Sequence, residues 1–313
     1  MKIKAAVLSE IGLPPPYAES RPLTIAEVEL DPPGAGEVLV KVAAAGLCHS
    51  DLSVINGSRP RPLPMVLGHE ASGVVAETGA GVTDLAAGDH VVFVFVPCCG
   101  HCLPCMEGRP ALCEPGAAAN GAATLLGGAR RLRRDGETLN HHVGVSCFAE
   151  YATVSRRSLV KIDPALPLDE AALFGCAVIT GVGAVVNTAR LRPGSTAAVV
   201  GLGGVGLNAL LGARMAGARK VIGIDMLDDK LDLARQIGAD ETFNAGDPDI
   251  VAKLREATGG GVDYAFEMVG SVKAMELAYR ITRRGGETVS AGLSHPDHPF
   301  AIQHVRSEER RAG

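Results

Sequence analysis

Short apolar runs separated by Gly and Pro dominate the first hundred residues of the chain. Three of them, EVLVKVAAAG (37–46), ASGVVAETG (71–79) and DHVVFVFV (89–96), are rich in Val and have the length of a strand. Segments such as DPPGAGE and RPRPLPMVLG lie between them and favour turns. The pattern predicts an antiparallel, barrel-like first domain.

The hydrophobic pattern changes after about residue 163. Apolar runs then alternate with segments of helical period, and strands are expected at 196–201, 220–225, 241–245, 262–270 and 285–292. Strands separated by helices are typical of βαβ units, whose strands pair in parallel. The predicted fold class is therefore α/β, with a β-rich first domain followed by a doubly wound parallel sheet.

The region between these two patterns, residues 98 to about 145, fits neither of them. It begins with CCGHCLPCMEGRPALC and continues through EPGAAANGAATLLGGARRLRRDGETLN, where no helical or strand period persists. We predict a loop-rich excursion from the first domain. His141 and His142, near its end, are interpreted as loop residues, because neighbouring residues rarely chelate one ion together.

Composition narrows the class of protein. The 313 residues suffice for about two domains, and 30 Lys and Arg against 35 Asp and Glu give a net charge of −5, which disfavours nucleic acid and anionic lipid as partners. The start MKIKAAVLSE has too few apolar residues for a signal peptide, and the weakly polar run at 171–186 is too short and glycine-rich to span a bilayer comfortably. We expect a cytoplasmic protein, in which clustered thiols favour metal binding over disulfides.

A dinucleotide-binding motif lies in STAAVVGLGGVGLNALLGARMAGA (195–218). Its glycines have the GxGxxG spacing between a buried strand and a helix: they are Gly201, Gly203 and Gly206, with Gly204 and Val205 inside the motif. The first glycine permits a tight turn, the second lets the backbone approach a pyrophosphate, and the third lets helix and strand pack closely. A glycine-rich helix start that binds nothing is the alternative.

The next predicted strand ends at Asp225, nineteen residues after Gly206. A carboxylate at about that distance bonds the adenosine ribose in dinucleotide-binding folds and repels a 2′-phosphate, so NAD is favoured over NADP. Lys230 is either a second ribose contact or a solvated lysine.

Four cysteines near residue 100 have the spacing C-x2-C-x2-C-x7-C: they are Cys99, Cys102, Cys105 and Cys113. Four thiolates complete the tetrahedron of a structural Zn²⁺ and leave no position for substrate. Reactive or redox thiols are the alternative. Cys98 is a fifth thiol that could replace Cys99, although we interpret it as a non-ligand, and Cys147 as a small buried hydrophobe.

Five motifs together, in this order, resemble the zinc-dependent alcohol dehydrogenases of the medium-chain dehydrogenase/reductase family: GLCHSD, GHE, the four-cysteine lobe, GC…TG and GLGGVG. The resemblance runs from near residue 1 to about 305. It implies a catalytic domain with a GroES-like barrel at 1–177, carrying a structural-zinc lobe at about 97–145. It also implies an NAD-binding Rossmann domain at 178–313.

The same resemblance implies a second, catalytic zinc. Its ligands would be Cys48, His69 and Cys176, with the fourth position left for water or the alcohol oxygen, and Glu70 would lie behind the metal. Asp51 would bond His69 and fix its tautomer. Zinc acidifies the alcohol, which then yields hydride to the nicotinamide.

Further residue roles follow from the resemblance alone. Ser50 would pass the alcohol proton outward, and His49 stands where the family places an Arg or His near the pyrophosphate. Thr180 would contact the nicotinamide. Phe95 would line the substrate pocket. The expected cofactors are two Zn²⁺ per chain and NAD, and the expected substrate is a primary or aryl alcohol or its aldehyde.

The chain departs from the family pattern at its end. After FAIQHV it continues as RSEERRAG, polar and charged throughout, so the sixth sheet strand is missing. In the family this strand pairs across the dimer, and an unpaired edge invites aggregation. We therefore expect a C-terminally truncated Rossmann domain, reduced stability and an impaired homo-oligomer.

Three alternatives to an active alcohol dehydrogenase follow. A zinc- and nucleotide-binding remnant without turnover is one. A relative of the glutathione-dependent formaldehyde dehydrogenases is another, although Ala117 stands where those enzymes carry an arginine. A zinc-free quinone reductase is disfavoured by the intact Cys48, His69 and Cys176.

Overall fold

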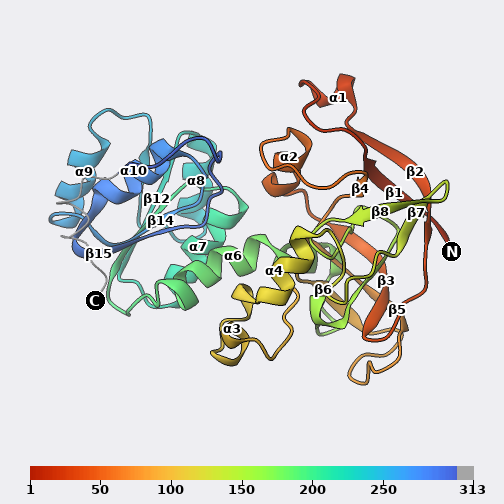
Figure 1. Ribbon diagram of the computed structural model, residues 1–313. Coiled ribbons are helices and arrows are strands. Elements are labelled where there is room, and N and C mark those ends of the chain that lie inside the picture. Colours follow the sequence, from red (N-terminus) through yellow and green to blue (C-terminus); the bar gives the residue numbers. More distant parts are fainter. Residues whose placement is uncertain (302–313) are drawn as a thin grey trace. The chain divides into compact units, whose positions relative to one another are not determined.

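The computed structural model describes residues 1–301 and divides the chain into two compact units, Met1–Cys176 and Ala177–Gly313. Figure 1 colours the first unit from red to green and the second from green to blue. The residues RSEERRAG, on which the expectation of a missing sixth strand rests, lie outside the described range.

The first unit is built from two sheets with short helices. A closed barrel has the strand order β1-β2-β7-β8-β4, and a second sheet has the order β10-β6-β5-β3-β9 (Figure 1). The strands are β1 (Lys2–Leu8), β2 (Leu23–Leu30), β3 (Glu37–Ala45), β4 (Met65–Val66), β5 (Ala71–Thr78), β6 (His90–Phe93), β7 (Leu132–Arg134), β8 (Glu137–His141), β9 (Tyr151–Ser155) and β10 (Leu159–Lys161). The helices are α1 (Tyr17–Ser20), α2 (His49–Ile55), α3 (Leu103–Met106), α4 (Glu114–Gly121) and α5 (Leu168–Ala171), with short 3₁₀ turns at Pro110–Leu112, Arg156–Ser158 and Ala172–Gly175.

Alternating side chains fill the barrel. Ile3, Ala5 and Val7 of β1 point into one core together with Val28 and Leu30 of β2, while Lys2 and Lys4 are exposed. This is the period of two that a strand imposes. The pairing is antiparallel except between β4 and β8, which run in parallel.

The region from 98 to 145 is more ordered than its sequence indicates. The expected loop contains helix α4, and its last part forms β7 and β8, which belong to the closed barrel. The prediction of an excursion was wrong for these strands. They are three and five residues long with polar outer faces. They pair with each other as a hairpin through Asp135–Gly136, a local signal that the sequence-based prediction did not use, and β2 and β4 join this hairpin to the barrel.

The second unit is a parallel sheet with the order β13-β12-β11-β14-β15, and helices cover both faces. Its strands are β11 (Thr196–Val200), β12 (Lys220–Asp225), β13 (Glu241–Asn244), β14 (Val262–Glu267) and β15 (Thr282–Ser290). Its helices are α6 (Ala177–Gly183), α7 (Gly204–Met215), α8 (Asp228–Gln236), α9 (Ile250–Thr258) and α10 (Val272–Ile281), with a π-helical turn at Ala184–Thr188. The predicted fold class is confirmed.

Successive residues of β11 explain why this sheet is buried on both sides. Ala197 and Val199 face a core shared with α7, whereas Ala198 and Val200 face a core shared with α9 and α10. A strand covered on both faces reads as a continuous apolar run, as TAAVV does.

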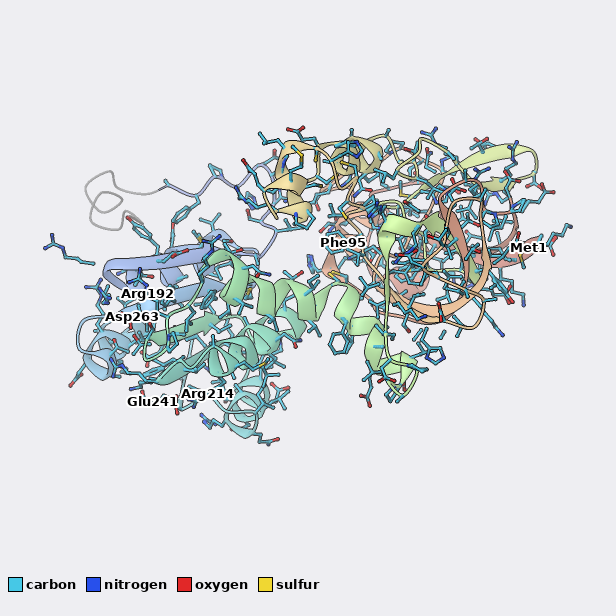
Figure 2. All side chains as sticks on the ribbon, turned by 90° about the horizontal axis from the view of Figure 1, so that it is seen from below. Met1, Phe95, Arg192, Arg214, Glu241 and Asp263 are labelled. Atoms are coloured by element: carbon cyan, nitrogen blue, oxygen red, sulfur yellow. The ribbon has the colours of Figure 1, made fainter. Side chains whose placement is uncertain are left out.

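One carboxylate ties the amino ends of three of these strands. Asp263, which is labelled in Figure 2, accepts hydrogen bonds from the backbone N and Oγ1 of Thr196, each 2.7 Å long, and from Nε of Arg283 at 2.6 Å. These contacts occupy the amino ends of the strands. The carboxyl ends remain for ligands, as in other open α/β sheets.

No single helix within residues 1–301 is long and apolar enough to cross a membrane, although the bent pair Leu168–Gly175 and Ala177–Thr188 would pass on length and composition alone.

Candidate functional site: two cysteine clusters and a glycine-rich turn

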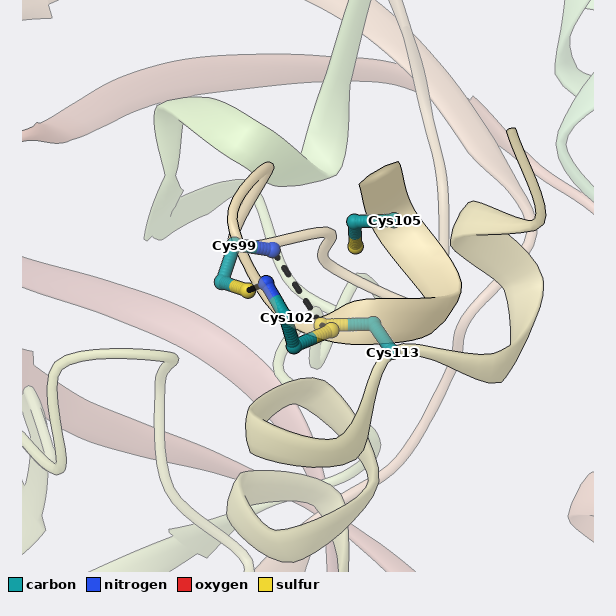
Figure 3. Close-up of side chains that lie close together, drawn as sticks. All are labelled: Cys99, Cys102, Cys105 and Cys113. Atoms are coloured by element: carbon teal, nitrogen blue, oxygen red, sulfur yellow. Dashed lines mark hydrogen bonds between the residues drawn. The ribbon is translucent and has the colours of Figure 1, made fainter. Parts of the chain in front are cut away.

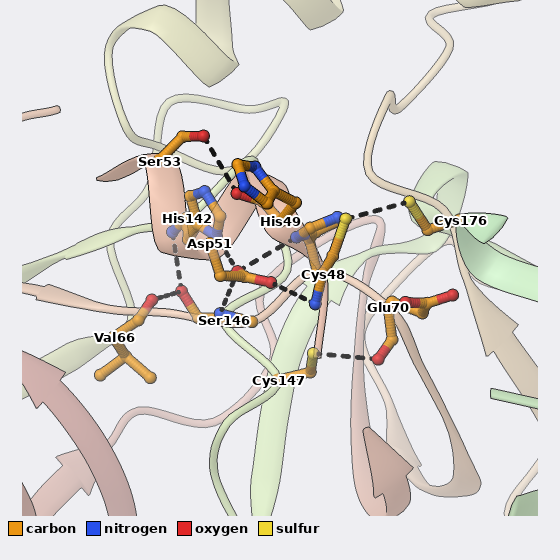
Figure 4. A network of polar contacts seen from close by, with 12 residues as sticks. Cys48, His49, Asp51, Ser53, Val66, Glu70, His142, Ser146, Cys147 and Cys176 are labelled. Carbon is orange, nitrogen blue, oxygen red and sulfur yellow. Dashed lines mark hydrogen bonds and ion pairs between the residues drawn. The ribbon is translucent and has the colours of Figure 1, made fainter. Parts of the chain in front are cut away.

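A group of three potential metal ligands forms in the first unit from segments far apart in sequence. The ligand atoms of Cys48, His69 and Cys176 all lie within 4.8 Å of one another. Cys48 precedes α2, His69 lies between β4 and β5, and Cys176 follows the 3₁₀ turn at Ala172–Gly175 (Figure 4). The structure therefore brings together the three residues that the family resemblance selected.

The two sulfurs are at a separation that suits zinc. Cys48 Sγ and Cys176 Sγ are 3.8 Å apart. A tetrahedral ion with Zn–S bonds of about 2.3 Å places two sulfur ligands about 3.8 Å from each other. The donor set and its spacing fit a Cys2His zinc site.

Asp51 links Cys48 to His69 because of its place at the start of α2. Its Oδ2 accepts the backbone N–H of Cys48 at 3.4 Å, in the manner of a helix-capping carboxylate. Its Oδ1 accepts the backbone N–H of Gly68 at 3.2 Å and lies 3.1 Å from Nδ1 of His69. With Nδ1 as the donor, the lone pair of His69 Nε2 is free to bind a metal.

His142 contacts the same carboxylate and was missed as part of this site. Its Nδ1 lies 3.1 Å from Oδ1 of Asp51, although the ring N–H is not aligned with that oxygen, and its ring packs edge-on against His69 with centroids 5.5 Å apart. His141 points elsewhere: it is the last residue of β8, and its Nε2 accepts the backbone N–H of Arg131 at 3.0 Å. The interpretation of both histidines as loop residues was wrong for His141, which belongs to strand β8. The two side chains point apart because successive residues of an extended chain face opposite sides.

The pKa values of the cluster reflect its close contacts. The hydrogen bond from the Cys176 thiol lowers the pKa of Cys48 to about 3, although burial opposes this shift, and the same contact raises the pKa of Cys176. Burial disfavours the charged form of His69, but hydrogen bonds to Asp51 and Cys48 outweigh it and raise its pKa to about 10. Since a metal needs the neutral imidazole and thiolates, its binding displaces protons from this cluster.

The remaining predicted residues of this region surround the three ligands. Glu70 is buried beside Gly46, where a Cβ on the glycine would lie 2.6 Å from its Oε2, and it does not belong to the group of Cys48, His69 and Cys176. His49 is exposed, and Ser50 is half-buried and hydrogen-bonds the Cys48 sulfur through its backbone. The Phe95 ring meets His69 edge-on, with centroids 5.5 Å apart.

Four more cysteines form a second cluster in the lobe. The sulfurs of Cys99, Cys102, Cys105 and Cys113 all lie within 4.8 Å of one another (Figure 3). Cys102 Sγ and Cys113 Sγ are 4.0 Å apart, close to the spacing of two zinc ligands. Cys98 is half-buried and does not belong to this group.

Backbone N–H groups surround the lobe thiols. His101 N and Cys102 N donate to Cys99 Sγ at 3.5 and 3.3 Å and lower the pKa of Cys99 to about 6. Cys113 Sγ accepts Cys99 N and Gly116 N, at 3.2 and 3.4 Å. The loop backbone thus favours a thiolate at Cys99, whereas burial and the neighbouring thiols raise the pKa of Cys105 to about 12.

The glycine-rich turn of the second unit has the shape its motif predicts. Gly201 has φ +92°, and a Cβ on Gly206 would lie 1.8 Å from the carbonyl oxygen of Gly201. At Gly203 a Cβ would meet nothing within 4 Å, so this side of the turn is open. Helix α7 starts at Gly204, followed by Val205, and its free N–H groups suit a phosphate.

Asp225 holds the same turn. Its Oδ2 accepts the backbone N–H of Leu202 at 2.8 Å, and its Oδ1 accepts those of Met226 and Leu227. Nζ of Lys230 is 4.0 Å from Oδ2. Thr180 lies on α6, which packs closely on α7: a Cβ on Gly181 would lie 2.3 Å from the carbonyl oxygen of Val205.

A cavity of about 570 Å³ lies elsewhere on the first unit. Gly36, Asp84, Leu126 and Arg156 are among its lining residues, and none of the predicted zinc ligands lines it. Two of its charged groups are paired with each other, since Arg156 donates to both carboxylate oxygens of Asp84. We assign it no part in the chemistry.

Comparison with known proteins defines the class first: residues 34–164 match the alcohol dehydrogenase GroES-like domain, and residues 204–312 match the zinc-binding dehydrogenases. An S-(hydroxymethyl)glutathione dehydrogenase of Synechocystis is 42% identical over 94% of this chain and 79% of its own length. The chain belongs to the zinc-dependent alcohol dehydrogenases of the medium-chain dehydrogenase/reductase family, which are oxidoreductases.

Two solved structures are close in fold. A zinc-binding-domain alcohol dehydrogenase protein from Burkholderia ambifaria has a TM-score of 0.90 and 37% identity, over 98% of this chain and 81% of that one. Benzyl alcohol dehydrogenase from Acinetobacter calcoaceticus has a TM-score of 0.89 and 33% identity, with the same coverage. The predicted family and fold are confirmed.

Proposed function

We propose that this enzyme is an NAD-dependent dehydrogenase that oxidises a primary or aryl alcohol to its aldehyde at a zinc ion held by Cys48, His69 and Cys176. The observation that carries the proposal is the convergence of these residues, with two sulfurs 3.8 Å apart beside an imidazole fixed by Asp51. Small-molecule alcohols and aldehydes are the substrates of the family. The Acinetobacter relative named for benzyl alcohol supports the aryl choice.

The protein supplies the charge and orientation that such an ion needs. Two thiolates and a neutral imidazole balance the charge of Zn²⁺, which supplies a Lewis acid that makes the alcohol proton easier to remove. Asp51, 3.1 Å from Nδ1 of His69, would keep the imidazole proton on Nδ1, so that Nε2 would be free to hold the zinc. Ser50 and the exposed His49 are the proposed path by which the alcohol proton leaves the site.

The turn at Gly201–Gly206 and the carboxylate of Asp225 support NAD as the cofactor. The carboxylate terminates the strand after the glycine motif and is held beside it by the N–H of Leu202. A 2′-phosphate placed there would meet negative charge. Lys230 is a proposed second contact to the ribose, and Thr180 a contact to the nicotinamide.

The lobe cysteines are proposed to hold a structural zinc. Four sulfurs fill a tetrahedron, so this ion would bind no substrate and would contribute to folding. The lobe is therefore a second zinc site with no part in hydride transfer.

A second candidate substrate is the glutathione adduct of formaldehyde, which the name of the Synechocystis relative favours. Ala117 argues against it, because an uncharged residue replaces the arginine expected in such enzymes. Comparing kcat/KM for S-hydroxymethylglutathione and for benzyl alcohol distinguishes the two substrates.

The experiment that tests the proposal combines zinc content per chain with NAD and NADP reduction across a panel of alcohols. Two zinc ions with turnover on NAD support it. Zinc with no turnover on any alcohol indicates a remnant, and preference for NADP overturns the role of Asp225. The cytoplasmic location and the impaired homo-oligomer stay predictions, the latter open to light scattering.

A further inference from the structure

A buried carboxylate at the carboxyl end of β14 has no role in the chemistry described above. Glu267 is 1% exposed. Its Oε1 accepts the backbone N–H groups of Val269 and Gly270, each at 2.7 Å, and its Oε2 accepts the hydroxyl of Ser290 at 2.7 Å. A buried carboxylate is costly unless donors surround it, and these three, all within the described part of the chain, satisfy it without a cation.

Glu267 joins two segments that follow neighbouring strands. Its side chain binds the turn 268–270 after β14 and Ser290 at the end of β15. Its carbonyl oxygen also accepts the N–H groups of Ala291 and Gly292, at 2.9 and 3.3 Å. The two segments are in close contact, since a Cβ on Gly292 would lie 2.1 Å from Gly270 N.

The turn 268–270 also contacts the glycine motif. A Cβ on Gly201 would lie 2.4 Å from Cγ2 of Val269. The Val269 side chain is 54% exposed, an apolar group at the carboxyl edge of the sheet. Any shift of this turn therefore changes the surface next to the pyrophosphate position.

Strand order identifies which half of the cofactor this surface receives. Strand β11, which leads into the glycine motif, lies between β12 and β14 in the sheet. Asp225 at the end of β12 places the adenosine on one side of the motif, and dinucleotides extend across this crevice. The ends of β14 and β15 therefore lie under the nicotinamide half.

We propose that Glu267 is a positioning residue for the nicotinamide half of NAD: it holds the turn 268–270 and the segment 290–292 in the shape on which that half packs. The inference rests on the proposed function only in requiring that NAD binds at the glycine motif. Glu267 itself touches no reacting atom.

The test compares NAD with ADP, which carries the adenosine and the pyrophosphate but not the nicotinamide half. Dissociation constants for both are measured by calorimetry on the purified full chain, for the wild type, Glu267→Ala, Glu267→Gln and a matched control, Glu287→Ala on β15. Losing the three hydrogen bonds to this charged acceptor should weaken NAD about tenfold in E267A and ADP less than about twofold. E267Q, whose amide oxygen can accept the same N–H groups, should stay within about threefold of wild type for both ligands.

Each other outcome overturns the inference. Equal weakening of NAD and ADP in E267A shows a general structural role, and no change shows none. If E267A does not melt cooperatively, Gly292→Ala replaces it. Its Cβ would lie 2.1 Å from Gly270 N and 2.8 Å from Oε2 of Glu267, so it displaces the same contact without removing the carboxylate, and it should also weaken NAD selectively. A wild-type chain that binds ADP but not NAD contradicts the inference alone, whereas one that binds neither contradicts the proposed function as well.

Discussion

The two cysteine clusters of the first unit differ in where their ligands come from. The lobe cluster takes four sulfurs from one stretch of fifteen positions, Cys99 to Cys113, and its hydrogen-bond donors are backbone N–H groups of the same loop. The other cluster takes two sulfurs and one imidazole from three distant segments, and its orienting group is a buried carboxylate, Asp51. A site made by one loop is closed and local, whereas a site made by the whole fold can leave a position open.

The difference extends to electrostatics. The lobe lowers the pKa of a thiol by backbone dipoles, and nothing charged needs to be buried for it. The three-ligand site buries a carboxylate, a histidine and a thiol together, so its charges depend on one another. Substitutions should therefore act on the lobe mainly through stability and on the other cluster mainly through metal affinity and turnover.

The largest effect is expected for Cys48→Ser. Losing a thiolate ligand should weaken zinc binding at the proposed catalytic site and remove most of the polarisation of the alcohol by the zinc. That polarisation lowers the activation free energy by several kcal/mol, so kcat/KM should fall roughly 10³-fold or more. Zinc content should drop from two ions to one, measured by plasma mass spectrometry alongside NAD reduction. Retained turnover would show that Cys48 is not a ligand.

Cys102→Ser should have the opposite profile. Loss of the lobe ion is expected to remove about 3 kcal/mol of folding free energy and to lower the melting temperature by roughly 10 °C. Scanning calorimetry and limited proteolysis check this, and turnover per remaining catalytic zinc should change little. If turnover falls as far as in Cys48→Ser, the two clusters are not functionally separate.

Asp51→Asn tests the orienting carboxylate. An amide keeps the shape but lacks the charge, and losing such a partner should weaken zinc binding about 10- to 100-fold. Competition with a chromogenic chelator measures this affinity, and the lobe ion should be unaffected. Asp84→Asn is the matched control, since that exposed carboxylate pairs with Arg156 far from any cysteine in sequence, and zinc affinity should not move.

The same contrast explains what the sequence could predict. The lobe ligands and the glycine motif follow from spacing alone, because all their residues belong to one local segment. Cys48, His69 and Cys176 have no common spacing, so only the ordered family motifs selected them. His142 carries no local signal, because its partner Asp51 is 91 positions away in the chain. Glu267 bonds the adjacent turn, but its other partner, Ser290, is 23 positions away and could not be inferred from the sequence.

Secondary structure follows the same rule. Strands β11, β12 and β14 were the most predictable of the parallel sheet, since each is a largely buried apolar run followed by a helix. Strands β13 and β15 are only partly buried and carry a weaker pattern. Strands β7 and β8 were missed although the Asp-Gly pair between them favours a hairpin, because the two runs are short and only three of their eight residues are buried. Their place in the barrel, beside β2 and β4, depends on partners far away in the chain.

The smallest effect is expected for Cys98→Ser, and it sharpens the ligand set of the lobe. Cys98 is adjacent to Cys99 in sequence, so spacing alone allows either to bind, but only the Cys99 sulfur lies with the other three. A half-buried non-ligand thiol replaced by a hydroxyl should change stability by less than about 0.5 kcal/mol. Zinc content should stay at two, whereas Cys99→Ser should reduce it to one. If instead Cys98→Ser loses a zinc ion and Cys99→Ser keeps both, Cys98 is the ligand. The backbone N–H groups of His101 and Cys102 would then surround the sulfur of a non-ligand, Cys99.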